Sequence, residues 1–397
     1  MDHSDRAVIS TADDAILAKL SCVEKGYYKD EFVHAMATGV KGANSCRDRN
    51  GSSSMEPIIR KGTHARVCVV EKAISAFLKL RLEDDTTDDV KGKRQVVICG
   101  AGRDTTYLRY RFRYLKGFED NQVNWFEVDH PFVVEQKANI WLRNCSPEGY
   151  NYNSEMNVTT GASYRASFSS LDGCDTDDST YHLIGHDLRS PPSSLFEKLC
   201  DPFHGYDRSI PTIFVLECVI MYLPDEASCN LLRYLAGNGA DVNQTNQMDS
   251  LVTIAMYDPI PNNDRFGQVM LNNLHKRGII GQKHQDGEQH EQLSLERTRT
   301  LSDHLAKLSN SGFDIAVGCH MMDAYHGIVS IDDQRRAARC EMLDELEEFV
   351  LLMRHYCFCI GVHSDGDKYK SAAEDLCSTG KDSPIGFKEG KCMVVRN

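Results

Sequence analysis

The stretch QVVICGAGRDTT, residues 95–106, decides the fold of this chain. Its first part is a short, continuous apolar run, which is typical of a strand buried on both faces of a sheet. Gly100 and Gly102 follow, and glycines at the carboxyl end of a strand allow a sharp turn and a close approach to a ligand. An ordinary tight turn between strand and helix stays open as an alternative, because Thr105 and Thr106 stand where the dinucleotide fingerprint has its third glycine.

Four further segments have the same form, and helical patterns lie between several of them. A helix is predicted over 132–142, and another after Pro224 that closes at Gly237. Repeated strand–helix units of this kind predict an α/β fold with a doubly wound sheet. The additional strands are expected at WFEVDHP (125–131), YHLIGHDLR (181–189), TIFVLECVIMYL (212–223) and SLVTIAMYD (250–258).

Composition shifts divide the chain into three predicted parts. Residues 11–40 have a helical pattern, and RVCVVEKAISAFLKL (66–80) has apolar residues on one helical face. The segment 341–362 starts helical and ends in a β-prone run that would close the sheet. We therefore expect a helical cap (1–93) with a mobile loop (44–57), a core (94–362) with inserts near 143–180 and 259–310, and a loosely ordered tail (363–397).

Charge and composition exclude several classes of protein. The 397 residues include 45 Lys and Arg against 58 Asp and Glu, a net charge of −13, and 41% are hydrophobic. Such a chain can bury a core, and it lacks the basic field that would hold nucleic acid or an anionic membrane surface. No apolar run reaches the ~18 residues of a membrane span, and the N-terminus has no leader pattern, so we expect a soluble, cytoplasmic protein.

The positions of the cysteines in the sequence indicate buried free thiols and not a metal site. There are 15 of them, most lie in apolar runs, and no CxxC pair occurs. Structural zinc needs paired ligands at a fixed spacing, so we expect no metal.

Acidic residues stand at or near the ends of three predicted strands. Asp129 ends the second strand, Asp187 follows the third, and Glu217 lies within the fourth. Open α/β sheets bind ligands at the carboxyl ends of their strands, and a carboxylate suits a ribose diol. Further acids would repel a pyrophosphate but suit the sulfonium and ammonium groups of S-adenosylmethionine. The pattern therefore favours this methyl donor over NAD, although each acid alone could be a surface carboxylate or a turn cap.

The carboxylate of such a donor needs a cation, and two basic residues are candidates. Arg66 begins the amphipathic segment ahead of the sheet, and Lys19 lies in the N-terminal helical region. Both could equally be solvated surface charges.

Several motifs in order resemble the leucine carboxyl methyltransferases, over about residues 11–361. They are TADDAILAKLSCVEKGYYKDEFV, RKGTHARV, VVICGAGRDTTYLR, FEVDHP, YHLIGHDLR, LECVIMYL and NNDRFGQVM. The resemblance implies a class I methyltransferase fold, Rossmann-like, with a helical N-terminal cap and inserted lid segments. It also implies methylation of the C-terminal leucine of the type 2A protein phosphatase catalytic subunit, which regulates holoenzyme assembly. Donor binding is implied for Lys19, Arg66, Gly100, Asp129, Asp187, Leu188 and Glu217, with Gly102 in the same turn.

The implied reaction needs no acid or base. An α-carboxyl group has a pKa near ~3.5 and is ionised at neutral pH, so alignment and desolvation should suffice. Tyr222 and Arg265 are candidates for the substrate pocket, and an internal Asp264–Arg265 cluster is the alternative for the latter. A methyltransferase for a small carboxylate or phenol, and a non-catalytic donor-binding module, remain alternative functions. We expect a monomer.

Overall fold

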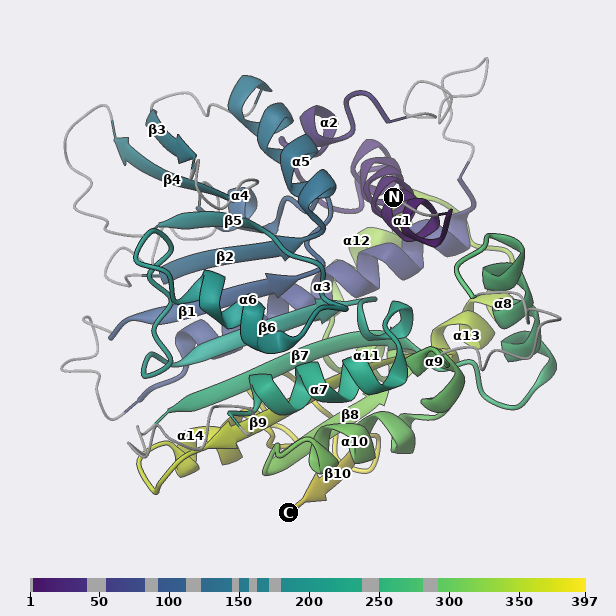
Figure 1. Ribbon diagram of the computed structural model, residues 1–397. Coiled ribbons are helices and arrows are strands. Elements are labelled where there is room, and N and C mark those ends of the chain that lie inside the picture. The colour runs from purple at the N-terminus through teal and green to yellow at the C-terminus, as the bar shows by residue number, and fades with distance from the viewer. Residues whose placement is uncertain are drawn as a thin grey trace, which may run out of the picture.

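A ten-stranded mixed sheet runs through the computed structural model, which describes residues 3–40, 55–82, 92–111, 123–144, 150–156, 163–170, 180–237, 250–280 and 292–397. The strands lie in the order β10-β8-β9-β7-β6-β1-β2-β5-β4-β3 (Figure 1). Five pair in parallel: β1 (Arg94–Cys99), β2 (Val123–Asp129), β5 (Tyr181–Gly185), β6 (Thr212–Glu217) and β7 (Leu251–Pro259).

The parallel strands confirm the predicted doubly wound α/β sheet. The first strand, β1, pairs with β2 on one side and with β6 on the other, so the chain order reverses at β1. Ligands of open α/β sheets bind at such a switch point, outside the carboxyl ends of the strands. Helices α6 (Pro192–Leu199), α7 (Asp225–Leu235) and α10 (Leu301–Asn310) cover one face, and α3 (Pro57–Lys79) and α5 (Pro131–Asn144) cover the other.

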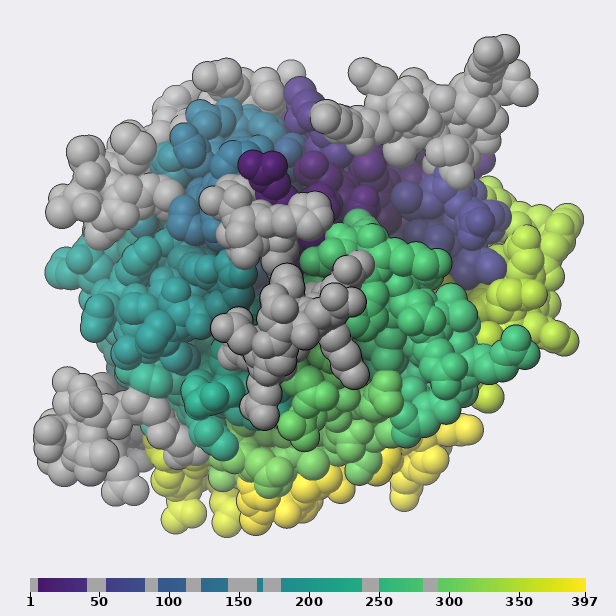
Figure 2. Space-filling model, turned by 45° about the vertical axis from the view of Figure 1, so that its right-hand side comes forward, coloured from purple at the N-terminus to yellow at the C-terminus, as the bar shows by residue number. Residues whose placement is uncertain are grey.

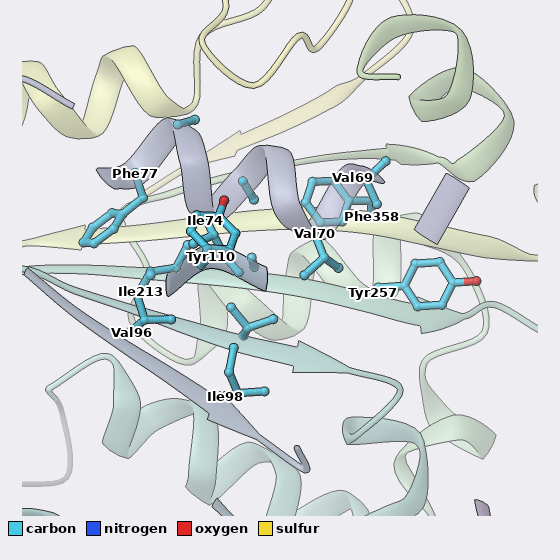
Figure 3. Packing of buried hydrophobic residues seen from close by; sticks show 14 of the residues in the cluster. Val69, Val70, Ile74, Phe77, Val96, Ile98, Tyr110, Ile213, Tyr257 and Phe358 are labelled. Atoms are coloured by element: carbon cyan, nitrogen blue, oxygen red, sulfur yellow. The ribbon is translucent and has the colours of Figure 1, made fainter. Parts of the chain in front are cut away.

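Helix α3 belongs to the core of the sheet and not to a separate N-terminal domain. Its face with Val70, Ile74 and Phe77 packs on strand residues such as Val96 and Ile213 in one continuous cluster (Figure 3). Each buried side chain of this size contributes about 1.5–3 kcal/mol relative to exposure. The predicted boundary at residue 93 therefore does not separate two cores.

The N-terminal segment, for which a helical pattern over 11–40 is predicted, forms two helices. Helix α1 (His3–Glu24) ends before Gly26, whose φ of +85° is left-handed and so stops the helix. After a short connection comes α2 (Val33–Met36). Of the predicted mobile loop 44–57, residues 44–54 lie outside the described residues.

The two predicted inserts contain regular structure. Within 143–180, β3 (Tyr150–Met156) and β4 (Ser163–Ser170) extend the sheet beyond β5, so this segment is part of the sheet and not a surface appendage. Within 259–310 lie α8 (Arg265–Lys276), α9 (Ser294–Arg297) and α10. Residues 145–149, 157–162, 171–179 and 281–291 of these inserts are outside the described ranges.

The C-terminal segment contains the predicted closing strand, but its tail differs from the prediction. The closing strand is confirmed as β9 (Tyr356–Ser364), which follows α13 (Leu346–Arg354) and runs antiparallel between β7 and β8 (Ile315–His320). The tail after residue 363 is ordered: α14 (Lys370–Leu376) buries Leu376, and β10 (Met393–Arg396) pairs with β8. Polar composition hid these elements, because a short helix and an edge strand need few apolar residues. Helices α4 (Thr106–Arg109), α11 (Met321–Gly327) and α12 (Ile331–Cys340) complete the described elements that bear on the site.

Within the described residues, no helix combines the length and apolar character required to cross a bilayer.

Candidate active site

A cavity of about 520 Å³ opens at the carboxyl edge of the parallel strands. Its walls come from α1, the start of α3, the glycine turn after β1, the ends of β2 and β6, helix α8, and α13 with the start of β9. On the face shown in Figure 2, the purple residues of α1 adjoin the green residues of α8 and the blue-violet residues of α3. The volume lies in the range of small-molecule sites.

Nine of the ten residues singled out from the sequence line this cavity, although they come from six separate segments of the chain. They are Lys19, Arg66, Gly100, Gly102, Asp129, Asp187, Leu188, Glu217 and Tyr222. Because the carboxyl ends of neighbouring parallel strands meet at one edge, the acids at the ends of β2 and β6 and the one just after β5 line the same cavity, as expected.

Asp129, at the end of β2, is held by backbone groups. Its Oδ2 accepts from the Gly102 N–H at 2.6 Å, and its Oδ1 accepts from the His130 N–H at 2.6 Å. Burial raises the pKa of Asp129 above its usual value, and these two N–H groups oppose the rise. Each carboxylate oxygen can accept a second hydrogen bond, so the group can bind a diol while it fixes the glycine turn.

The glycine turn requires glycine at Gly100 for two reasons. Its φ is +69°, in the left-handed region that other residues avoid. A Cβ atom there would lie 2.6 Å from Cγ2 of Val219, a side chain from the neighbouring strand connection. The backbone thus lies directly against the segment after β6.

We expect Gly100→Ala to lower the free energy of unfolding by about 1–2 kcal/mol from the left-handed backbone and by about 1–3 kcal/mol more from the overlap with Val219. Gly205→Ala is the matched control, because Gly205 has nearly the same φ, +70°, but no atom within 4 Å of an added Cβ. Urea unfolding of both variants measures the difference. Equal losses would contradict the proposed close approach.

Four charged side chains form a chain of ion pairs in the inner part of the cavity. Lys19 Nζ lies 2.7 Å from Asp104 Oδ1 and 3.6 Å from Glu217 Oε2, and Arg66 donates from Nε to Glu217. The side chains of Lys19 and Asp104 are only 7% and 9% exposed. Helices α1 and α3 therefore contribute the cations, and the glycine turn after β1 and the end of β6 contribute the anions.

The cations keep both carboxyl groups ionised in spite of their burial. Burial by itself would raise the pKa of Asp104, but the Lys19 ammonium holds it well below its usual value. Burial also acts to raise the pKa of Glu217. The charges of Arg66 and, to a smaller extent, Lys19 outweigh this effect, so the pKa of Glu217 lies below its usual value. Burial would lower the pKa of Lys19, but Asp104 and Glu217 raise it. All three groups are charged at neutral pH.

Asp104 was not among the residues predicted for the site. A signal was present, because it directly follows the glycine turn in GAGRDTT. A carboxylate there is placed to meet a cation from the N-terminal helix, but nothing in the sequence shows that α1 lies over this turn.

A buried network fixes the N-terminal helices to the glycine turn. Asp30, before α2, accepts from the Phe32 and Val33 N–H groups with Oδ1, and its Oδ2 accepts from the Thr105 hydroxyl at 2.5 Å. Arg109 of α4 donates to Glu71 of α3. Thr105, which stands in place of a third glycine, thus has a structural role that sequence inspection alone did not suggest.

Aromatic side chains line the wall behind Arg66. Tyr257 and Tyr356 stack with their ring centroids 5.3 Å apart, and the Arg66 guanidinium lies 5.2 Å from the Tyr257 ring centroid. Arg66 is therefore held between a carboxylate and a π face, which favours arginine over lysine. Tyr222 lies beside this wall in a 3-10 turn (Ile220–Tyr222). The strand predicted over 212–223 is shorter than expected: β6 ends at Glu217, and the 3-10 turn follows it.

Asp187 lies at the outer part of the cavity and has a local partner. Arg189 donates to both of its carboxylate oxygens, with Nη2 2.7 Å from Oδ2 and Nε 2.9 Å from Oδ1. Burial acts to raise the pKa of Asp187, but the hydrogen bonds from Arg189 lower it below its usual value. A ligand that uses Asp187 must therefore share it with Arg189.

Arg265 is exposed and does not line the cavity, contrary to the expectation from the sequence. The alternative cluster with Asp264 is not formed either. Asp264 instead caps α8 by accepting from the Gly267 N–H at 2.8 Å, and its Oδ2 lies 3.0 Å from His355 Nε2. Arg265 is the first residue of α8, and the sequence does not show which face of this helix lies toward the cavity.

The described part of the chain contains no group of three or more His, Cys, Asp or Glu side chains arranged to hold a metal ion.

Comparisons with known proteins point to one family. The family model for leucine carboxyl methyltransferase matches residues 7–236, which include every predicted site residue that lines the cavity. The "Leucine carboxyl methyltransferase 1 homolog" of Arabidopsis thaliana is 31% identical over 91% of this chain and 91% of its own length. Leucine carboxyl methyltransferase 1 of Rattus norvegicus is 28% identical over 90% of each chain.

Solved structures are more distant. A DUF574 family protein from Streptomyces avermitilis has a TM-score of 0.41 and 10% identity, covering 79% of this chain and 93% of that chain. A likeness of this size carries no argument about function.

Proposed function

Because this chain belongs to the leucine carboxyl methyltransferase family, we propose that its cavity binds S-adenosylmethionine together with the C-terminal tail of a type 2A protein phosphatase catalytic subunit. As a member of the family, the chain is an enzyme that methylates the carboxylate of a C-terminal leucine. The observation that carries the choice of donor is the placement of charge in the inner part of the cavity: Asp104 and Glu217 lie beside Lys19 and Arg66, and the Asp129 carboxylate accepts from backbone N–H groups.

The cavity fits the methyl donor by this chemistry. The donor supplies an electrophilic methyl group on a sulfonium, and it also carries an ammonium and one carboxylate. The ionised carboxylates of Asp104 and Glu217 suit the two cationic groups, and Arg66 offers a guanidinium to the single carboxylate. Asp129 presents carboxylate oxygens to a ribose, beside backbone that Gly100 allows to approach closely.

The residues of this chain act by binding, orienting and excluding water. The attacking carboxylate of a terminal leucine is already ionised at neutral pH, so no side chain has to remove a proton. Tyr222, Tyr257 and Tyr356 form an apolar wall beside the charged residues, and burial raises the pKa of each, so all three stay neutral. Desolvation and alignment in such a pocket are the expected sources of rate.

A transfer assay tests this proposal. Purified chain is mixed with S-adenosylmethionine labelled on the methyl group and with phosphatase catalytic subunit, either intact or lacking its terminal leucine. We expect label on the intact subunit, released by mild base as a methyl ester should be, and none on the truncated one. Equal labelling of both would favour a small-molecule or less specific methyltransferase. Donor binding without S-adenosylhomocysteine formation would favour a non-catalytic module.

The location and the oligomeric state of the enzyme are also part of this proposal. We further propose that the enzyme acts as a monomer in the cytoplasm, where it would meet its protein substrate. The net charge of −13 of the chain supports a protein partner over nucleic acid.

A further inference from the structure

We propose that Cys319 and Cys392 form a reversible disulfide that fastens the C-terminal strand to the sheet. The inference is independent of the proposed function, because it rests on strand register and on the contact between the two thiols. Cys319 lies in β8, and Cys392 immediately precedes β10. Both are free thiols in this structure.

The register of the two strands places the two cysteines opposite each other. In the antiparallel pairing of β10 with β8, Met393 is the partner of Gly318. One step further along the same ladder, Cys392 stands opposite Cys319. Residues directly opposite each other on antiparallel strands have their side chains on the same face, and both cysteines belong to the same apolar cluster.

The hydrogen-bond pattern makes this position suitable for a disulfide. Continued by one step past Arg396 and Ile315, the same register places Asn397 opposite Asp314. The Asn397 N–H donates to the Asp314 carbonyl at 2.9 Å, so Asn397 and Asp314 form a hydrogen-bonded pair of the ladder. Hydrogen-bonded and non-hydrogen-bonded pairs alternate along an antiparallel ladder. Cys392 is five positions from Asn397, so it forms a non-hydrogen-bonded pair with Cys319. Cα atoms in such pairs are about 4.5 Å apart, within the range that a disulfide spans.

The two thiols already interact, and they differ in the way that a redox pair requires. A hydrogen bond from Cys319 lowers the pKa of Cys392, and the same contact raises that of Cys319. Cys392 is partly exposed, whereas Cys319 is 1% exposed. An accessible thiol with thiolate character beside a buried partner suits attack from outside followed by internal resolution.

The oxidant is a small disulfide such as glutathione disulfide. The Cys392 thiolate attacks one glutathione sulfur, and the first glutathione leaves as a thiolate. Cys319 then loses its proton and attacks Cys392 Sγ, so that the second glutathione leaves. The protein dithiol is oxidised by two electrons, and glutathione disulfide is reduced to two thiols.

The bond would stabilise a short, partly exposed edge of the sheet. Strand β10 has four residues, pairs only with β8, and leaves Met393 and Val394 44% and 43% exposed. The segment from 319 to 392 also contains α13 and Tyr356, which contribute to the cavity wall. The disulfide closes this segment into a loop, which restricts the unfolded chain.

The test treats the full chain with glutathione disulfide, alkylates the remaining thiols and maps the peptides by mass spectrometry. We expect a peptide pair joining Cys319 and Cys392, a rise in Tm of about 3–6 °C over the reduced protein, and at least ~10-fold slower amide exchange in residues 393–396. Dithiothreitol should reverse all three.

Variants separate this bond from general thiol oxidation. Cys392→Ser should abolish the linked peptide and the rise in Tm, whereas Cys319→Ala should leave Cys392 as a stable mixed disulfide with glutathione. Cys229→Ser, which removes a comparably exposed thiol on α7, should behave as the wild type. A wild-type protein whose Cys392 stays free or ends as the mixed disulfide would overturn the inference, as would a Cys392 bond to another cysteine.

Discussion

Replacing Arg66 by alanine is expected to weaken binding of S-adenosylhomocysteine about 100-fold, which corresponds to roughly 2–3 kcal/mol. The guanidinium is the group we assign to the carboxylate of the donor, and it is also the partner of Glu217. Its loss removes a charge-assisted contact with the ligand and leaves Glu217 with only Lys19, at 3.6 Å. Calorimetry measures the affinity, and the transfer rate should fall with it.

The loss of Arg66 also has a pH signature. Because Arg66 is the main cause of the low pKa of Glu217, that pKa should rise in Arg66→Ala. In the wild type the pKa of folded Glu217 lies below its unfolded value, so this contribution to stability is present above the unfolded pKa and is lost as pH falls. The variant should therefore lose less stability on acidification than the wild type does.

Two further variants control this experiment. Arg66→Lys keeps the charge but not the planar fork or the stacking on Tyr257, so an intermediate loss of about 10-fold is expected. Arg335→Ala removes an arginine of α12 that is 70% exposed, and it should leave affinity unchanged. If Arg66→Ala bound the ligand as tightly as Arg335→Ala, the assignment of the cavity to the donor would be wrong.

Asp129→Asn is expected to reduce donor affinity by about 100-fold or more. The carboxylate accepts from two backbone N–H groups, of Gly102 and His130, through different oxygens. An amide offers only one oxygen, so one of these N–H groups loses its acceptor, at a cost of about 1–3 kcal/mol. The glycine turn then loosens at the same time as the ribose contact is lost.

A modified ligand separates the two effects of Asp129→Asn. If Asp129 binds the ribose diol, the wild type should discriminate against a donor product lacking the 2′-hydroxyl, and the variant should lose most of that discrimination. Asp187→Asn is the matched control, since Asp187 is partly exposed and already shared with Arg189; about a 10-fold loss is expected there. Unchanged discrimination in Asp129→Asn would assign Asp129 a structural role alone.

Local sequence patterns were sufficient to place the central strands and their acidic ends. Continuous apolar runs predicted β1, β2, β5, β6 and β7, because strands buried on both faces leave no room for polar alternation. The same patterns failed where an element is short or half-exposed, as in β10 and α14. They also failed where an interruption is set by one residue, as at Gly26 after α1.

The chain order of strands and glycines thus fixed the parallel sheet and the edge at which Asp129, Asp187 and Glu217 meet, since parallel strands end together. Tertiary structure alone decided which residues from distant segments complete the cavity: Lys19 over Asp104, Arg66 against Tyr257, and Arg265 outside. The physical reason is that strand register follows from local apolar patterning. The position of a surface helix such as α1 instead depends on long-range packing and ion pairs that no short stretch encodes.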